Sequence, residues 1–300
     1  MANITAQMVK ELREISGAGM LDCKKALDQN DGNMENAIDW LRTKGLASAA
    51  KKASRVAAEG LVAIAVEGNK ATVVEVNSET DFVAKNDIFQ EYVADAALIA
   101  LASNGDVEEM KNFACPKCGK SFGERLTDMI AKIGENMNLR RAQMVEVENG
   151  VVSAYVHNAA APNVGKIGVL VALESDGDKA ELSALGKQIA MHIAASNPIA
   201  LDVADVDTHV LEREKAIIAE KAKASGKPEN IIEKMVEGGL RKFYDEVVLL
   251  EQKFIMDTDK KVKEILGNAK IKEFVAFRLG EGIEKKEEDF AAEVAAQLGK

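Results

Sequence analysis

The hydrophobic positions of the first 45 residues have the spacing of short helices. In the first of them, apolar side chains recur on one helical face, at Met8, Val9, Leu12 and Ile15. Turn-forming residues at 17–19, 30–32 and Gly45 divide the segment into three. This pattern predicts a three-helix bundle whose third helix stops at Gly45. Residues 46–59, rich in Ala, Lys and Ser, lack a wide apolar face and predict an exposed helical linker.

From Gly60 the hydrophobic period changes to two. Residues 61–66 and 71–76 alternate as strands around a turn at 67–69, and a helical pattern over 87–103 follows. The same order recurs from Gly150, with a longer loop between its two strands and a helix around 185–196. This recurrence predicts two copies of one α+β unit. The alternative is a chance likeness of two hairpin-helix stretches, since the side chains of the two copies match poorly.

Three further stretches complete the predicted organisation. A helix over 123–137 leads into a strand over 142–148, between the two copies. Helical patterns over 206–225 and 229–244 are broken only at Gly226-Lys227-Pro228, which predicts an antiparallel coiled-coil hairpin. Its surplus apolar surface offers a site for a second subunit, which would form a homodimer. A strand over 273–279 and an acidic amphipathic helix over 287–298 end the sequence.

The predicted fold class is therefore α+β, built from several parts. The predicted domains are an N-terminal three-helix bundle at 1–45, a linker at 46–59, a core N-subdomain at 60–149, a core C-subdomain at 150–205 continued at 245–279, a helical hairpin at 206–244, and a C-terminal module at 280–300.

Composition and charge narrow the kinds of partner. Lys and Arg number 39 against 49 Asp and Glu, a net charge of −10, which disfavours direct binding to nucleic-acid phosphates. The longest obvious apolar run, 96–102, is far shorter than the roughly 20 residues of a membrane span. The N-terminus lacks the pattern of a secretory signal, and three cysteines suit a reducing compartment. We expect a cytoplasmic protein with a protein or small-molecule partner.

The pair Cys115 and Cys118 leaves several interpretations open. A C-x-x-C knuckle presents two thiolates to zinc, but a tetrahedral site needs four ligands and no second pair exists. The pair is therefore a plain loop insertion, a zinc half-site completed by other ligands, or a redox dithiol. Residues 119–121, Gly-Lys-Ser, end like a phosphate-binding loop, but Ala114 stands where that loop requires glycine. We expect no bound nucleotide, cofactor or metal of the chain's own.

Catalytic patterns give no enzyme candidate. The sequence has no Gly-x-Ser-x-Gly elbow, no His-Glu-x-x-His and no obvious pair of catalytic carboxylates. His192, within a helical pattern, is expected to pack, whereas His157 ends a strand at a loop. The chain is not expected to catalyse a chemical reaction.

The segment Glu75-Val-Asn-Ser-Glu-Thr-Asp-Phe-Val-Ala-Lys85 is the sharpest local oddity, because a strand runs through polar residues into an aromatic pair before the next helix. One interpretation is that Thr80 or Asp81 caps a helix and Phe82 packs into the core. The other is that a loop tip presents an acid and an aromatic side chain to a partner protein, as binding hot spots do.

These residues also carry a resemblance to a known family. The stretches 12–27 and 75–85 closely resemble the two signature stretches of the bacterial elongation factor Ts family, and the resemblance continues nearly end to end. It takes in 133–136 (IGEN), 167–171 (IGVLV), the helix around His192, 225–228 (SGKP), 234–238 (KMVEG) and 280–284 (GEGIE). The departures are Ser16 in place of the usual Thr, the insertion with the two cysteines, and the lengthened loop after His157.

The resemblance implies a guanine-nucleotide exchange factor for elongation factor Tu. It implies a ubiquitin-associated-like N-terminal bundle, a duplicated core, a coiled-coil hairpin and a C-terminal module. In that family the segment matching Thr80, Asp81, Phe82 and Val83 contacts the GTPase and dislodges its magnesium ion, and the histidine matching His157 approaches the same partner. The rival functions are a non-catalytic adaptor with a ubiquitin-associated-like module and a zinc-dependent enzyme that uses the cysteine pair.

Overall fold

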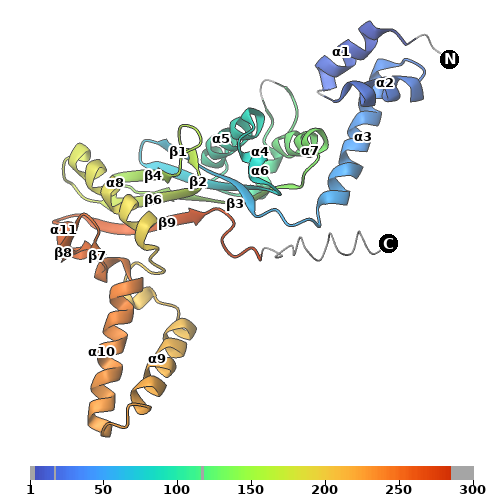
Figure 1. Ribbon diagram of the computed structural model, residues 1–300. Coiled ribbons are helices and arrows are strands. Elements are labelled where there is room, and N and C mark those ends of the chain that lie inside the picture. The colour runs from blue at the N-terminus through green and yellow to red at the C-terminus, as the bar shows by residue number, and fades with distance from the viewer. Residues whose placement is uncertain (1–3, 17, 116–117, 285–300) are drawn as a thin grey trace. The chain divides into compact units, whose positions relative to one another are not determined.

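The computed structural model describes residues 4–16, 18–115 and 118–284. Helices and antiparallel strands alternate along the chain, which confirms the predicted α+β class (Figure 1). The chain divides into two compact units. Unit 1 comprises residues 1–63, 74–142 and 278–300, and unit 2 comprises 64–73 and 143–277. The two units are described separately below.

The N-terminal segment of unit 1 forms three helices, as predicted: α1 (Ala6–Ser16), α2 (Met20–Gln29) and α3 (Met34–Lys52). They bury a small core of their own that includes Leu12, Cys23 and Leu27. The predicted stop at Gly45 is wrong. Helix-forming residues continue beyond Gly45. Gly45 is also buried where α3 packs against α7 (Phe122–Ile133), and a Cβ atom at Gly45 would be in ordinary contact with Ala131. The helix therefore takes in part of the predicted linker.

The first hairpin forms as predicted, with β1 (Glu59–Glu67) and β2 (Lys70–Ser78) joined by two residues. Two helices follow at once: the single turn α4 (Asp81–Ala84) and α5 (Asp87–Ala102). The side chain of Asn86 accepts a hydrogen bond from the backbone of Ile88 and so caps α5. Buried residues of α5 include Phe89 and Tyr92. The short link between β2 and α5 thus holds α4 close to the end of a buried strand.

The helix and strand that complete unit 1 have other limits than predicted. After α6 (Val107–Asn112), α7 is closed at its start by a capping box of Ser121 and Glu124. We expected this helix to run to residue 137, but it ends at Ile133, because Gly134 takes the left-handed conformation that stops a helix. The strand β3 (Met137–Glu146) consequently starts five residues earlier than predicted. The four-stranded sheet has the order β3-β2-β1-β5, where β5 is Val164–Gly165.

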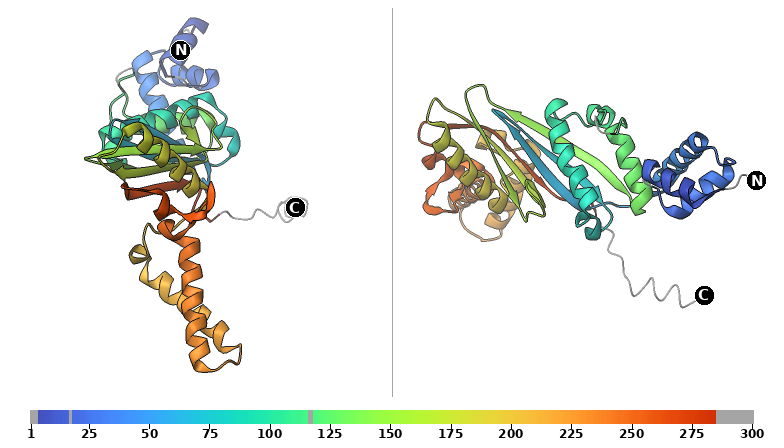
Figure 2. Two further views of the ribbon diagram at one scale, coloured as in Figure 1. Left: turned by 90° about the vertical axis from the view of Figure 1, so that its left-hand side faces the viewer. Right: turned by 90° about the horizontal axis from the view of Figure 1, so that it is seen from above.

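Unit 2 is built on a three-stranded sheet in the order β4-β6-β9 (Figure 2). Its strands are β4 (Gly150–His157), β6 (Ile167–Glu174) and β9 (Lys270–Arg278). Strands β4 and β6 pair antiparallel, with His157 opposite Ile167. Helix α8 (Lys179–Ser196) packs on β4 and β6, and Ile189 and Ile193 join the core formed by the strands.

The two hairpins begin with the same unusual backbone. Gly60 in β1 and Gly150 in β4 have φ values of 123° and 145°, which L side chains rarely adopt. At each position a Cβ atom would lie within 2.2 Å of a carbonyl oxygen on the partner strand, that of Val76 or of Leu173. The glycines that matched in the sequence therefore share one local geometry. This likeness supports the duplicated core, which otherwise stays a prediction.

The predicted helical hairpin is present as α9 (Thr208–Lys223) and α10 (Glu229–Val247), which contact each other along their length (Figure 1). The remaining elements of unit 2 are the 3-10 turns η1 (Val203–Asp205) and η2 (Leu249–Glu251), strands β7 (Lys253–Phe254) and β8 (Asp257–Lys261), and α11 (Val262–Ile265). Pairing of the hairpin with a second copy stays a prediction.

The end of the sequence is described only in part. Strand β9 begins three residues before the predicted strand over 273–279 and ends one residue before its predicted end. The predicted acidic helix over 287–298, and with it most of the predicted C-terminal module, lies outside the described residues. Within the described part of the chain, no helix has both the length and the hydropathy to cross a membrane.

Candidate functional site

The single turn α4 presents an aromatic side chain to solvent. Phe82 is 75% exposed, the largest exposed fraction of any phenylalanine in the described chain, and Asp81 beside it is also exposed. The interpretation in which Phe82 packs into the core is therefore wrong. The cause is the short helix itself, which turns Val83 and Ala84 inward, at 3% and 5% exposure, and leaves the preceding two side chains outside.

Several contacts hold α4 from its C-terminal side. The carbonyl oxygens of Phe82 and Val83 accept from the backbone of Lys85 and Asn86 at 3.1 and 2.9 Å, and Gln90 Nε2 donates to the Ala84 carbonyl at 2.9 Å. The carbonyl groups of the turn are thereby satisfied although α4 has only four residues. The buried side chains and these hydrogen bonds fix the backbone beneath Phe82.

Lys85 accompanies the two exposed side chains. Its ammonium group lies 2.9 Å from Asp81 Oδ2 and 5.3 Å from the centre of the Phe82 ring. Both side chains of the ion pair are more than half exposed, so the pair stabilises the fold by only about 0.5 kcal/mol. The contact between Lys85 and the ring is equally accessible, and a partner surface is able to displace it.

On the N-terminal side, every polar group of Thr80 has a hydrogen bond. Its backbone N–H donates to Glu135 Oε2 at 3.0 Å and its hydroxyl donates to Glu135 Oε1 at 2.8 Å. Its carbonyl oxygen accepts from the buried Ser78 hydroxyl at 3.0 Å. Thr80 is the N-cap residue of α4, as one interpretation expected, but its side chain makes no capping bond and bonds to Glu135 instead.

A second carboxylate, that of Glu79, bonds from the turn before α4 to the turn after α7. Glu79 Oε1 accepts from the backbone N–H of Asn136 and lies 3.5 Å from Arg55 Nη1. Asn136 in turn donates through Nδ2 to the Arg55 carbonyl at 2.7 Å. Glu79 and Glu135 therefore each bond to the turn that carries the other. We call Glu79, Thr80, Glu135 and Asn136 the carboxylate clasp.

No sequence pattern indicated the clasp. Glu135 and Asn136 lay inside a stretch assigned to a helix, where their role in a turn was not visible. The available signal was Gly134, because a glycine after the last apolar residue of a helix commonly ends it and places the next residues in a turn. That assignment would have placed Glu135 in a turn before β3, but its partner Thr80 follows only from the fold.

A buried charge lies further back on β2. Glu75 has no exposed side-chain surface, and its carboxylate accepts from Arg140 at 3.1 and 3.2 Å and from Arg141 at 2.5 Å. Asn77 Nδ2 and the Gly280 backbone N–H donate to it at 2.9 and 2.8 Å. Burial raises the pKa of Glu75, but the hydrogen bonds from Gly280, Asn77 and Arg141 outweigh it and hold the pKa below its ordinary value.

The same two arginines fix the segment that follows β9. Arg140 Nη2 donates to the Glu281 carbonyl at 2.7 Å, and Arg141 Nη2 donates to the Arg278 carbonyl at 3.1 Å. Gly280 has a φ of 73°, and a Cβ atom there would lie 2.4 Å from the Ala58 carbonyl oxygen. The late segment is thus bonded to the strand that leads to the candidate site.

His157 belongs to unit 2 and lies at the exposed end of β4. Its Nδ1 is 3.0 Å from the hydroxyl of Tyr155, which lies on the same face of the strand two residues earlier. The Lys166 backbone N–H donates to the His157 carbonyl at 3.1 Å. These bonds orient an exposed imidazole that is accessible to a partner protein.

The cysteine pair lies in the turn between α6 and α7. Cys115 is half-buried and Cys118 exposed, and neither forms a disulfide. The Cys115 backbone donates to the Lys120 carbonyl at 2.8 Å and the Gly119 backbone donates to the Cys115 carbonyl at 2.9 Å, so Cys115 is bonded to the residues that follow Cys118. Within the described residues, no group of three or more His, Cys, Asp or Glu could hold a metal ion. The loop-insertion, zinc half-site and redox interpretations all stay open.

His192 is packed in the core of unit 2, as predicted. Its Nδ1 accepts from the Ile255 backbone at 3.3 Å, so Nε2 carries the proton and donates to Gln252 Oε1 at 2.8 Å. Burial lowers the pKa of His192, and the hydrogen bond to Gln252 only partly opposes this. A neutral imidazole that is buried in the core, with a hydrogen bond at each ring nitrogen, is a packing residue.

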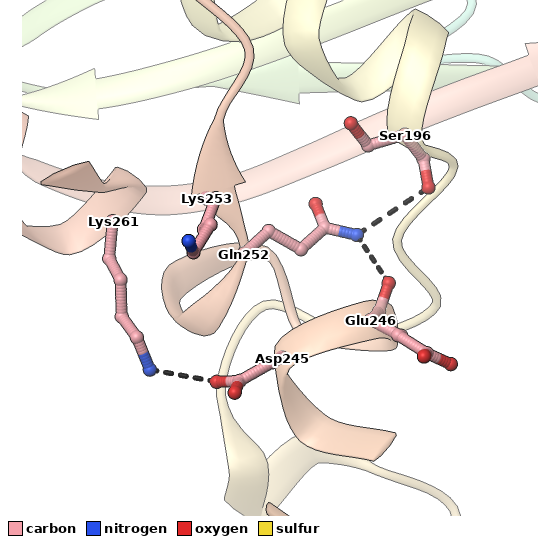
Figure 3. Close-up of a pocket in the computed structure, with 6 residues that line it drawn as sticks. All are labelled: Ser196, Asp245, Glu246, Gln252, Lys253 and Lys261. Carbon is pink, nitrogen blue, oxygen red and sulfur yellow. Dashed lines mark hydrogen bonds and ion pairs between the residues drawn. The ribbon is translucent and has the colours of Figure 1, made fainter. Parts of the chain in front are cut away.

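A polar pocket of about 300 Å³ lies next to Gln252, and Figure 3 shows its lining. The lining residues are Ser196, Asp245, Glu246, Gln252, Lys253 and Lys261. Gln252 Nε2 donates to the Glu246 carbonyl at 2.7 Å, and Lys261 pairs with Asp245 at 2.8 Å. These interactions connect the end of α10 to η2 and β8, so the groups around the pocket stabilise the base of the helical hairpin.

Comparison with known proteins agrees with the family resemblance of the sequence. The model of the family described as Elongation factor TS matches residues 79–281, which include α4, the clasp and His157. The chain is 58% identical to Elongation factor Ts of Paramagnetospirillum magneticum, over 100% of this chain and 98% of the relative. It is 56% identical to that of Rhodospirillum centenum, with both chains fully covered, and 55% identical to that of Sinorhizobium medicae, over 98% of each. The chain belongs to the elongation factor Ts family.

Proposed function

We propose that this chain binds elongation factor Tu with GDP bound and promotes release of the GDP, so that GTP replaces it during translation elongation. The observation that carries the proposal is Phe82, an aromatic side chain that is 75% exposed on a firmly held turn within the family match. An exposed aromatic beside an acid has the composition of a binding hot spot. The chain makes and breaks no covalent bond in this function.

The mechanism acts through the partner's own magnesium ion. In P-loop GTPases Mg²⁺ bridges phosphate oxygens and protein ligands, so a displacement of those ligands weakens GDP binding. Asp81 and Phe82 are the side chains that reach the partner, and Thr80 and Val83 hold them in place. Because coupling between two ligands is reciprocal, a chain that binds the nucleotide-free GTPase more tightly lowers nucleotide affinity by the same factor. The chain itself need not touch nucleotide.

The remaining features fit the same proposal. The N-terminal helices act as a ubiquitin-associated-like docking module, the core is a duplicated α+β unit, and α9 with α10 forms a coiled-coil hairpin that supports contact with the partner or a homodimer. Residues 280–300 form a C-terminal module. We propose a cytoplasmic protein that binds no nucleic acid directly, which accords with its net charge of −10.

The test is the release of fluorescently labelled GDP from elongation factor Tu, followed by stopped flow with and without this chain. We expect release to accelerate with chain concentration and then to saturate, because the exchange complex is an intermediate. Added Mg²⁺ should oppose the acceleration. A release rate that does not change with chain concentration would leave only a non-catalytic adaptor.

His157 supplies a prediction for unit 2. The variant His157→Ala should slow GDP release about 2- to 10-fold at limiting chain concentration, the size expected for one lost polar contact with the partner. Its melting temperature should stay unchanged, because the side chain is exposed. Tyr155→Phe is the matched control, since it removes the hydroxyl that orients the imidazole and keeps the ring. An unaltered rate in His157→Ala would remove His157 from the site.

A further inference from the structure

We propose that Glu135 and Glu79 are positioning residues that hold Phe82 ready for its partner through the carboxylate clasp. This inference rests on the proposed function, because it assigns a task to residues that touch neither partner nor nucleotide in it. The two carboxylates join the turn before α4 to the turn after α7, and these turns are 55 residues apart in the sequence.

The clasp fixes the backbone directly before an exposed side chain. Glu135 binds Thr80 with both oxygens, at 2.8 and 3.0 Å, and so fixes the rotation of the peptide unit that leads into α4. Ser78, which is fully buried, holds the carbonyl of the same residue. Two residues later, the Phe82 side chain is 75% exposed, and its ring lies 5.3 Å from the Lys85 ammonium group. The bonds are concentrated one step before the exposed side chain rather than on it.

The clasp opposes a tendency of exposed aromatic side chains to collapse onto the protein surface. A phenylalanine on a free loop gains by folding back onto apolar surface, and its partner must then reverse that collapse on binding. Carboxylate acceptors suit the task, because hydrogen bonds to an ionised group are shorter and stronger than neutral ones. Reciprocity between Glu79 and Glu135 also ensures that neither turn moves alone.

The clasp has an alternative role as mere reinforcement of the fold near Gly134. The two roles differ in what they do to Phe82. Reinforcement would lower the stability of unit 1 and reduce exchange only through loss of folded protein. If the clasp positions Phe82, its removal would change the motion of the side chain at position 82 and the exchange rate of protein that remains folded.

The first experiment reads the motion of residue 82 without elongation factor Tu. The variant Trp40→Phe/Phe82→Trp places the only tryptophan of the chain on α4, and time-resolved fluorescence anisotropy reports its local motion. Addition of Glu135→Ala should increase the amplitude of fast motion, whereas Glu135→Gln, which keeps two polar atoms toward Thr80, should restore most of the restraint. Glu91→Ala, at an exposed position of α5, is the matched control. Equal anisotropy in Glu135→Ala and the control would overturn the proposal.

The second experiment measures exchange in a double-mutant cycle. Glu135→Ala should slow GDP release about tenfold at limiting chain concentration. The measurement is made at a temperature where circular dichroism shows the variant to be folded. In the Phe82→Ala background the same change should have almost no further effect, because the clasp acts through that ring. Effects that multiply would overturn the proposal. Phe82→Ala that releases GDP at the parent rate would also overturn the proposal, because the clasp would then have no ring to act through. The proposed function fails separately, if the parent chain does not accelerate GDP release at all.

Discussion

Phe82→Ala should slow GDP release from elongation factor Tu about 30-fold at limiting chain concentration, while the chain stays as stable as the parent. Truncation of an aromatic hot spot costs about 2 kcal/mol or more of binding free energy, which corresponds to that factor. The side chain is 75% exposed, so its loss should change the free energy of unfolding by no more than about 0.5 kcal/mol. Stopped-flow release and thermal melting on the same sample measure the two quantities.

The matched control for this variant is Leu98→Ala. Leu98 is also a large exposed apolar side chain, 61% exposed, and lies in the C-terminal half of α5 outside the site. It should leave both exchange and melting unchanged. A loss of several kcal/mol of stability in Phe82→Ala, together with parent-like exchange by the folded fraction, would show that the ring is a core residue in solution.

Glu75→Gln should destabilise unit 1 by about 3 to 5 kcal/mol, the usual cost of removing one member of a buried ion pair. The substitution keeps the shape of the side chain but leaves Arg140 and Arg141 without their buried counter-charge. Urea unfolding measures the loss. The control is Glu146→Gln, whose carboxylate pairs with Lys70 at 3.4 Å on the surface, with both side chains 42% exposed, and which should cost less than about 1 kcal/mol.

The pH dependence of this loss has a definite sign. The folded-state pKa of Glu75 is held below its ordinary value of 4.5, so the unfolded chain binds a proton more readily than the folded chain. The stabilisation by Glu75 is therefore complete above about pH 4.5 and declines as the pH falls through the lowered folded-state pKa. The stability difference between the parent and Glu75→Gln should narrow below pH 4.5. A difference that stays constant down to pH 3 would exclude the charged network as its cause.

The sequence predicted the elements of this fold better than their ends. Hydrophobic period, together with the turn residues between the periodic stretches, identified the N-terminal helices, both hairpins and the α9–α10 pair. It misplaced the end of α3, because Gly45 was taken as a stop although its surroundings favour a helix, and the end of α7, because Gly134 was not taken as one. A glycine has no side chain to report its own backbone angle, so its meaning depends on packing that sequence patterns do not contain.

Some residues of the candidate site were predicted from the sequence and others were not. Asp81 and Phe82 were found from the sequence, because an aromatic residue in a polar turn is a local anomaly. Glu75, Glu79 and Glu135 were not assigned a role, since each acquires its partners from distant segments. An acid within a strand pattern gives no sign of whether it faces water or two arginines. Long-range polar pairing is the part of the site that local pattern leaves undetermined.

The bond between Glu75 and Gly280 also bears on how the chain is made. Its two ends are 205 residues apart, and a ribosome delivers the Glu75 strand long before the Gly280 donor exists. During synthesis, unit 1 is therefore completed only by a segment that follows all of unit 2. A translation product interrupted within β9 would hold a buried acid that lacks one of its donors. The hydrogen bonds of Glu75 are therefore completed only when synthesis has passed β9.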